Sequence, residues 1–220
     1  MRKYLIVFII LILIGTATEL RSAGIFNRTN IRISPGVSFP LGGHYNDSKK
    51  LRQILNLGVN AGLGLRFGLT NNTFLEFSFS ETWFSLKQEY RPFSYKERAP
   101  ALVMPMYFIN WVLFHKSNYA AEPYFIFGAG ISPWKFTRSG LFGKSWTAPA
   151  NSEEKFSDIS FGLNAGLGVE VFLFQKISFY TEAKYYYFFM RNVSKFGTDD
   201  FNQQDFLGVN VGVIFYFKKL

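Results

Sequence analysis

Apolar and polar residues alternate over long stretches of this chain, and this alternation limits the possible folds more than any other feature. Between residues 55 and 67, Leu, Val, Ala and Phe occupy the odd positions, whereas Asn, Gly and Arg occupy the even ones. A similar pattern returns between residues 161 and 173 and again between residues 207 and 217. A period of two places each residue type on its own face of a β-strand. These segments therefore predict strands with two unlike faces.

Eight such strands are expected, each long enough to cross a bilayer when tilted. Their predicted bounds are 30–39, 54–67, 73–86, 100–114, 122–136, 158–173, 177–188 and 206–217. Short connections fall at 68–72, 115–121 and 174–176, and long polar ones at 40–53, 87–99, 137–157 and 189–205. Short turns at one rim and long loops at the other are typical of membrane barrels. We therefore expect an all-β fold, an eight-stranded antiparallel up-and-down transmembrane β-barrel.

A soluble barrel of the lipocalin type is the structural rival, because it also alternates but keeps its apolar face inside. Here the apolar face is nearly free of charge across several strands, which would be an unusually oily surface in water. The other face is rich in glycine and carries charges that can pair only if they are gathered together. Aromatic residues make up 20% of the chain, which suits an outer surface in lipid. We expect the apolar face to lie outside.

The first residues read as a secretory signal peptide. Arg2 and Lys3 precede an apolar run from residue 4 to residue 14, which is too short to span a bilayer as a helix. Gly15 and Ala17 predict cleavage after residue 17, giving a signal peptide over 1–17. Ala23 is a second candidate, so the barrel is predicted over 24–220. An uncleaved anchor is the alternative, but the absence of cysteine excludes a lipoprotein.

The segment from residue 161 to residue 189 resembles a known family. A Gly-x-Gly strand with Gly166 and Gly168, a short turn and a strand with Glu182 are similar to the eight-stranded outer-membrane β-barrel domain family. That group includes OmpA-, OmpX- and OmpW-like barrels and PorT-like porin-family proteins. The resemblance implies a place in the outer membrane of a Gram-negative bacterium.

The C-terminal strand is similar to the family in a second way. Asn210, Gly212, Phe215 and Phe217 match the signal that the barrel assembly machinery reads in such proteins. The resemblance therefore implies that machinery as a partner. The chain departs from the pattern at its end, because Lys-Lys-Leu follows at 218–220 where many members stop at Phe.

Six charges fall on the inward face by alternation. They are Arg32, Arg66, Glu76, Glu170, Glu182 and Lys184, three of each sign. A charge in a narrow lumen must be paired or hydrated, and eight strands leave an interior that side chains fill. We favour a structural network over a lining for a narrow polar or proton path. Arg66 and Glu76 are expected to meet across the turn at 68–72. Glu170 and Glu182 are expected side by side across 174–176.

Residues suited to catalysis or metal binding are few. The two histidines, His44 in the first long loop and His115 in a short turn, are far apart in sequence. A loop of Gly, Asn, Asp and Lys is a poor mount for a catalytic base near Asp47 and Ser48. The pairs Glu153–Glu154 and Asp199–Asp200 read as solvated loop charges, with a weak Ca²⁺ site as the alternative. We predict no catalytic site, cofactor or metal.

Aromatic residues fit interfacial girdles better than a ligand cage. They are Trp83, Trp111, Trp134, Trp146 and the run from residue 185 to residue 189.

Net charge is +9, with no nucleic-acid motif. The first two long loops carry Lys49, Lys50, Arg52, Lys87, Arg91, Lys96 and Arg98, which predict contact with lipid A phosphates or else ordinary loop charge. The leading hypothesis is a non-enzymatic barrel whose loops meet lipopolysaccharide, a surface ligand or another envelope protein. The alternatives are a narrow pore or lateral route for small apolar solutes, and a lipid A-modifying enzyme that uses His44.

Overall fold

The computed structural model describes residues 29–42, 44–45, 49–85, 87, 101–115, 121–137, 157–174, 176–189 and 203–217. The long strands are β1 (Asn30–Gly42), β4 (Gly58–Gly68), β5 (Thr73–Ser85), β6 (Ala101–Phe114), β7 (Ala121–Thr137), β8 (Ser157–Phe174), β9 (Ile177–Phe189) and β10 (Gln203–Tyr216). Between β1 and β4 lie β2 (His44–Tyr45), β3 (Lys49–Lys50) and one helical turn, α2 (Leu51–Ile54). Within the described ranges, no helix has the length and apolar character needed to cross a membrane.

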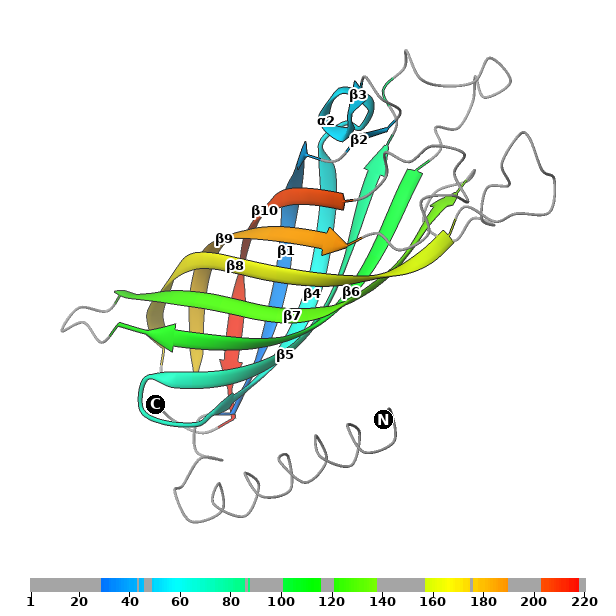
Figure 1. Cartoon of the computed structure of the whole chain (residues 1–220). Coiled ribbons are helices and arrows are strands. Elements are labelled where there is room, and N and C mark those ends of the chain that lie inside the picture. The colour runs from blue at the N-terminus through cyan, green and yellow to red at the C-terminus, as the bar shows by residue number, and fades with distance from the viewer. Residues whose placement is uncertain are drawn as a thin grey trace, which may run out of the picture.

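The long strands form one closed antiparallel barrel (Figure 1). Each strand pairs with its neighbours in sequence, and β10 closes the barrel against β1, where Ile31 lies opposite Phe215 and Val37 opposite Val209. Closure leaves no unpaired strand edge in the barrel wall. The predicted eight-stranded up-and-down barrel is therefore confirmed.

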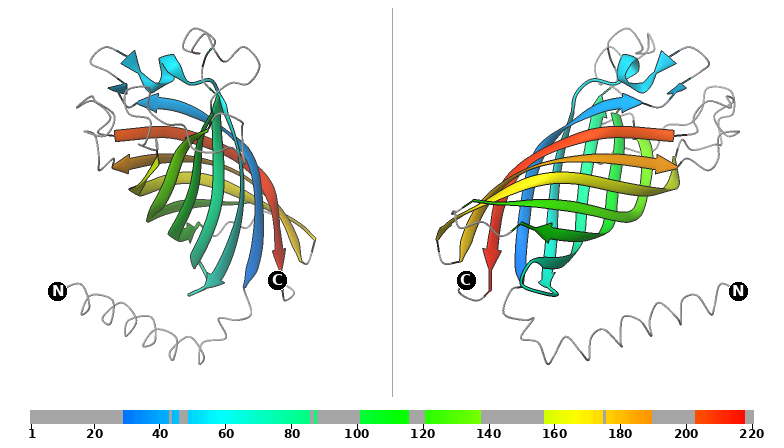
Figure 2. Two further views of the ribbon diagram at one scale, coloured as in Figure 1. Left: turned by 90° about the vertical axis from the view of Figure 1, so that its right-hand side faces the viewer. Right: turned by 60° about the vertical axis from the view of Figure 1, so that its left-hand side comes forward.

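The two rims of the barrel differ in the connections they carry. Short connections join β4 to β5, β6 to β7 and β8 to β9 at one rim (Figure 2). β1 begins and β10 ends at the same rim. We call this the turn rim. At the opposite rim, which we call the loop rim, β5, β7 and β9 end and β6, β8 and β10 begin, and β2, β3 and α2 lie beyond it (Figure 1). This arrangement matches the alternation of short and long connections read from the sequence.

The first loop differs from its prediction. The sequence pattern extends a strand back to residue 54, but β4 begins at Gly58, and residues 51–54 form α2. Leu55 was expected on the lipid face and is instead buried, with 3% of its surface exposed. The backbone N–H of Asn56 donates to the Ser85 carbonyl oxygen at 2.8 Å, which holds the chain against the end of β5. Alternation predicts which face of the sheet a side chain lies on only where the residue belongs to a paired strand. Leu55 comes before β4 begins, so the rule does not apply to it.

Burial along the strands shows which face is outside. On β8, Leu163 and Leu167 expose 43% and 67% of their surfaces, whereas Glu170 exposes none. The same inversion holds on β4, where Leu63 is exposed and Arg66 is fully buried. Large apolar side chains thus cover the outside of the barrel, which excludes the soluble alternative because such a surface requires lipid.

Inward glycines lie beneath bulky side chains of the neighbouring strand. The ring of Tyr180 lies across Gly212, the ring of Phe84 across Gly58 and the ring of Phe188 across Gly162. A Cβ atom on Gly212 would lie 1.9 Å from the Ile33 carbonyl oxygen, so this position excludes any side chain without backbone movement. Aromatic rings that cover glycines replace the packing that glycine lacks in a strand. The glycine-rich face therefore makes room for large inward side chains.

The sequence predicts that the Trp residues and the run 185–189 form interfacial girdles, but several of them face the interior instead. Trp111 faces lipid, but Trp134 is buried in the interior and its Nε1–H donates to Ser160 Oγ at 3.0 Å. Tyr186 and Phe188 also face inward. The girdle prediction was wrong for these three, because they occupy the inward positions of β7 and β9. Trp146 lies outside the described residues.

Candidate functional site in the barrel interior

The structure brings the six charged residues that were predicted to face inward together in the lumen. Arg32 comes from β1, Arg66 from β4, Glu76 from β5, Glu170 from β8, and Glu182 and Lys184 from β9. Each has at most 4% of its surface exposed. Six side chains from five strands thus share one buried cluster, which we call the lumen network.

Arg32 lies at the middle of this network. Its guanidinium binds Glu182 through two hydrogen bonds, Nη2 to Oε1 at 2.6 Å and Nη1 to Oε2 at 2.8 Å. Nη1 also donates to Glu76 Oε2 at 3.2 Å. The Tyr180 ring lies 4.2 Å from the guanidinium carbon, which adds a cation–π contact. A bidentate arginine contact of this kind fixes geometry as well as charge.

Arg66 joins the other half of the network. Its Nε donates to Glu76 Oε2 at 2.6 Å, and its Nη1 donates to Glu170 Oε2 at 3.4 Å. Arg66 and Glu76 are direct partners in the β4–β5 ladder, which is the approach expected across the turn at 68–72. At the other end, Lys184 Nζ lies 3.1 Å from Glu182 Oε1. The ion pairs therefore run Lys184–Glu182–Arg32–Glu76–Arg66–Glu170, with opposite charges in contact throughout.

The prediction that Glu170 and Glu182 lie side by side is wrong. In the β8–β9 ladder, Glu170 is opposite Tyr180 and Glu182 is opposite Gly168. The two carboxylates are thus offset diagonally by one inward position. Each binds a different arginine, Glu170 binding Arg66 and Glu182 binding Arg32, so the expected repulsion is avoided.

Neutral donors complete the coordination of the carboxylates, and the sequence reading missed them. Asn110 Nδ2 donates to Glu76 Oε1 at 3.0 Å, and the Tyr124 hydroxyl donates to Glu182 Oε2 at 3.0 Å. The hydroxyls of Ser178 and Tyr216 both donate to Glu170 Oε1. All four lie on inward positions of their strands. Alternation assigns these four residues to the lumen in the same way as the charged ones, but it does not show which neutral side chains donate to the carboxylates.

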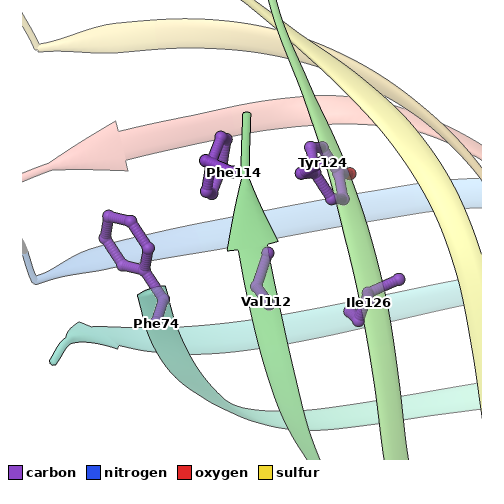
Figure 3. Close-up of a cluster of buried hydrophobic side chains, with 5 residues drawn as sticks. All are labelled: Phe74, Val112, Phe114, Tyr124 and Ile126. Atoms are coloured by element: carbon purple, nitrogen blue, oxygen red, sulfur yellow. The ribbon is translucent and has the colours of Figure 1, made fainter. Parts of the chain in front are cut away.

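Apolar layers close the lumen on both sides of the network. Toward the turn rim lies a cluster drawn in Figure 3, made of Phe74, Val112, Phe114, Tyr124 and Ile126. Beside it lie Tyr180, Ile214 and Tyr216, with Phe172 packed against them. Toward the loop rim, Phe84, Phe108, Tyr186, Phe188 and Phe206 form a connected set of ring contacts with centroids 4.9–6.0 Å apart. The described interior is packed above and below its charges.

Little space remains beside the network. A cavity lined by Arg32, Glu76 and Lys184 with several Ser and Asn residues has a volume of about 10 Å³. That is about the space needed for the centre of one water molecule. The arrangement cross-links five strands and fills this part of the lumen.

The remaining sequence-predicted residues lie elsewhere. Asn210 faces the lumen opposite Gly36 and Glu182, and Gly212 lies under Tyr180. Phe215 and Phe217 are on the outside, 41% and 55% exposed. Their use as an assembly signal stays a prediction.

The histidines lie at opposite rims. His44 belongs to β2 at the loop rim, and His115 is exposed at the turn rim, where its backbone N–H donates to Pro123. The predicted signal peptide, the carboxylate pairs at 153–154 and 199–200 and the tail at 218–220 lie outside the described residues.

Comparison with solved structures identifies the same fold. Neisserial surface protein A is 13% identical, with a TM-score of 0.57 over 86% of this chain and 97% of that one. The outer membrane protein OprG from Pseudomonas aeruginosa is 12% identical, with a TM-score of 0.55 over 87% of this chain and 96% of that one. No protein-family model and no curated protein matches.

Fold, outer surface and interior together define the class. The chain has the fold of the eight-stranded outer-membrane β-barrels, and its apolar outside face requires a bilayer. It is an integral protein of the bacterial outer membrane.

Proposed function

We propose that this barrel is non-enzymatic and acts through its loop rim, where basic loops bind the phosphates of lipopolysaccharide. The filled lumen is the observation that carries the proposal. The lumen network and the apolar layers on either side of it occupy the described interior, so the barrel offers no evident path for a solute. A role at the outer surface is what such a barrel can still supply.

Charge at the loop rim favours phosphate as the ligand. Arg52 is exposed on α2, and Lys87 Nζ donates to the Arg52 carbonyl oxygen at 2.9 Å. This contact joins the base of the first long loop to the base of the second. The segment 87–99 contains four cations, Lys87, Arg91, Lys96 and Arg98, against Glu89 and Glu97. Guanidinium and ammonium groups bind phosphate through charge-assisted hydrogen bonds.

The test is co-purification of lipopolysaccharide. Replacing Lys87, Arg91, Lys96 and Arg98 with Gln should lower the lipopolysaccharide retained by the purified barrel. A matched control replaces Arg138, Lys144, Arg191 and Lys195 in the other two long loops. Retention by the second-loop variant that is no lower than that of the control variant would reject the second long loop as the binding surface.

Orientation is part of the proposal, since the loop rim must face outward from the cell. Cysteine at Gln53 should react with an impermeant maleimide on intact cells, whereas cysteine at His115 should react only after lysis. Both positions are exposed. The reverse labelling would place the basic loops in the periplasm, away from lipopolysaccharide.

A lateral route for small apolar solutes is the second candidate, and one feature of the wall favours it. β6 and β7 are paired at Val103–Lys135 and again at Tyr107–Ile131, but residues 104–106 and 132–134 between them are not paired with each other. Pro105 and Pro133 lie in this gap, and proline has no N–H to donate to a ladder. Replacing both with Val should restore pairing. If apolar solute uptake falls in that variant, the lateral route gains over the surface role.

The enzyme alternative depends on His44 and has a separate test. A non-enzymatic barrel predicts that the mass spectrum of cellular lipid A is the same with and without the protein. A mass shift that disappears in a His44→Ala variant would overturn the non-enzymatic part of the proposal.

A further inference from the structure

An open groove crosses the lipid-facing side of β4, β5, β6 and β7. It has a volume of about 710 Å³ and an almost wholly apolar lining. Two rows of outward side chains wall it, one containing Phe77 and Ile109 and the next containing Phe79 and Tyr107. Its floor is the inward row of Gly64, Ser78, Phe108 and Gly130, in which the Phe108 side chain is buried in the barrel. The groove therefore follows the inward row of residues between two outward rows.

The depth of the groove places it among acyl chains. Phe79 is six residues from the loop-rim end of β5, and Tyr107 is six residues from that end of β6. At ~3.4 Å per residue and a tilt of about 45°, this is about 14 Å below the strand ends. An apolar groove at this depth faces the hydrocarbon of the leaflet nearer the loop rim.

Polar groups lie on the same side of the barrel, between the groove and the basic loops. Lys135 is on the outer face of β7, four residues closer to the loop rim than Ile131 in the groove. Trp83 Nε1–H donates to Glu81 Oε1 at 3.1 Å on the outer face of β5. Arg52 and Lys87 lie above these strands at the loop rim. Lys135, Arg52 and Lys87 thus lie on the loop-rim side of an apolar groove, with the Glu81 carboxylate held by Trp83 among them. This is the order of a phosphorylated headgroup over its chains.

We infer that the groove seats an acyl chain of lipid A, while Lys135, Arg52 and Lys87 hold the phosphates. The inference rests on the proposed function, because it names the part of the same lipopolysaccharide that the loops do not reach. A chain in the groove gains contact with fixed walls on two sides. In a bilayer such packing, rather than water exclusion, is what favours association.

Two alanines on the outer face provide the test and its matched control. Ala129 lines the groove, whereas Ala165 is exposed to lipid on β8 outside it. The variant Ala129→Phe fills the groove, and Ala165→Phe adds the same ring elsewhere. Full-length protein is purified from outer membranes, and bound lipid A is measured by mass spectrometry. Retained lipid A should fall by about threefold or more in Ala129→Phe and stay unchanged in Ala165→Phe.

Two probes separate this inference from the proposed function. Intact lipopolysaccharide carries chains and phosphates, whereas fully deacylated lipopolysaccharide carries phosphates alone. The Gln variant of the second loop should lose binding to both. Ala129→Phe should lose binding only to the intact form. If the loop variant keeps both ligands, the phosphate proposal fails, whatever Ala129→Phe does.

Three results would overturn the acyl-chain seat. Equal lipid A retention by Ala129→Phe and Ala165→Phe would exclude it. Displacement of phospholipid but not lipid A by Ala129→Phe would assign the groove to another lipid. A change from dimer to monomer in that variant would assign it to a second copy of the chain. Should Ala129→Phe fail to fold on an unheated gel, Ala129→Leu takes its place with Ala165→Leu as control.

Discussion

Glu182 and Leu167 lie on adjacent strands, yet they stand in opposite kinds of surroundings. Inside the barrel, the Glu182 carboxylate receives contacts from Arg32, Lys184 and Tyr124 within 3.1 Å. Outside it, Leu167 exposes 67% of its surface to the membrane. The interior is thus built from specific polar partners, and the exterior from side chains whose neighbours are fluid lipid.

This difference teaches where the sequence is constrained. An inward residue has fixed partners, and its loss leaves a charge or a cavity behind in a place without water. An outward residue has only to be apolar, because lipid adjusts to its shape. We expect the cost of substitution to depend on the face far more than on the size of the side chain. Three substitutions test that expectation, from the largest effect to the smallest.

The largest effect is expected for Arg32→Met. Arg32 binds both Glu182 and Glu76, so its loss leaves two buried carboxylates short of a cation. Breaking a buried pair in this way costs about 3–5 kcal/mol. Urea unfolding of the barrel in lipid vesicles measures it. Adding Glu76→Gln should restore part of the loss, because Lys184–Glu182 and Arg66–Glu170 then remain as two complete ion pairs. A loss below about 1 kcal/mol would mean that the network is hydrated and the faces are less different than described.

A smaller effect is expected for Gly212→Ala. The added Cβ would meet the Ile33 carbonyl oxygen and the Tyr180 ring, so β10 must shift against β1. Overpacking of this kind costs about 1–3 kcal/mol. Gly64→Ala is the control, because its Cβ would have 3.4 Å or more to its nearest neighbour. The same unfolding measurement should separate the two alanines. Equal stability would show that inward glycines are not fixed by their covering side chains.

The smallest effect is expected for Leu167→Ala on the outside. The substitution leaves no cavity that lipid cannot fill, so the free energy of unfolding should change by less than about 0.5 kcal/mol. Unfolding in the same vesicles gives the comparison directly. A loss as large as that of Gly212→Ala would remove the distinction between the two faces.

Alternation in the sequence was sufficient for the barrel and for its inside-out arrangement. Each of the six charged residues assigned to the lumen by parity is buried there, and Phe215 and Phe217 lie outside. The prediction succeeds because side chains alternate between the two faces of a strand. Once the face of one residue is known, the faces of the other residues in that strand follow. Leu55 shows the limit, since parity has no meaning before the ladder begins at Gly58.

Contacts across strands were harder to predict than faces. Arg66 and Glu76 follow from a short turn between paired strands, but Glu170 and Glu182 are displaced by one inward position because of where the β8–β9 turn is centred. Arg32 on β1 reaches Glu76 on β5 and Glu182 on β9, although no two of these strands are paired. β4 lies between β1 and β5, and β10 lies between β1 and β9. Such contacts depend on the stagger of the closed barrel, which no single strand encodes. Trp134 differs from its prediction for another reason. A Trp residue is typical of an interfacial girdle, but the alternation along β7 puts this one on the inward face.

Conductance across a planar bilayer tests the central claim, that the interior is a packed core and not a path. The wild-type barrel should leave the current indistinguishable from that of a protein-free membrane, because the lumen network lies between two aromatic layers. Insertion is verified in the same membranes by protection of the barrel from added protease. Discrete current steps that grow with salt concentration in wild-type protein would contradict the account.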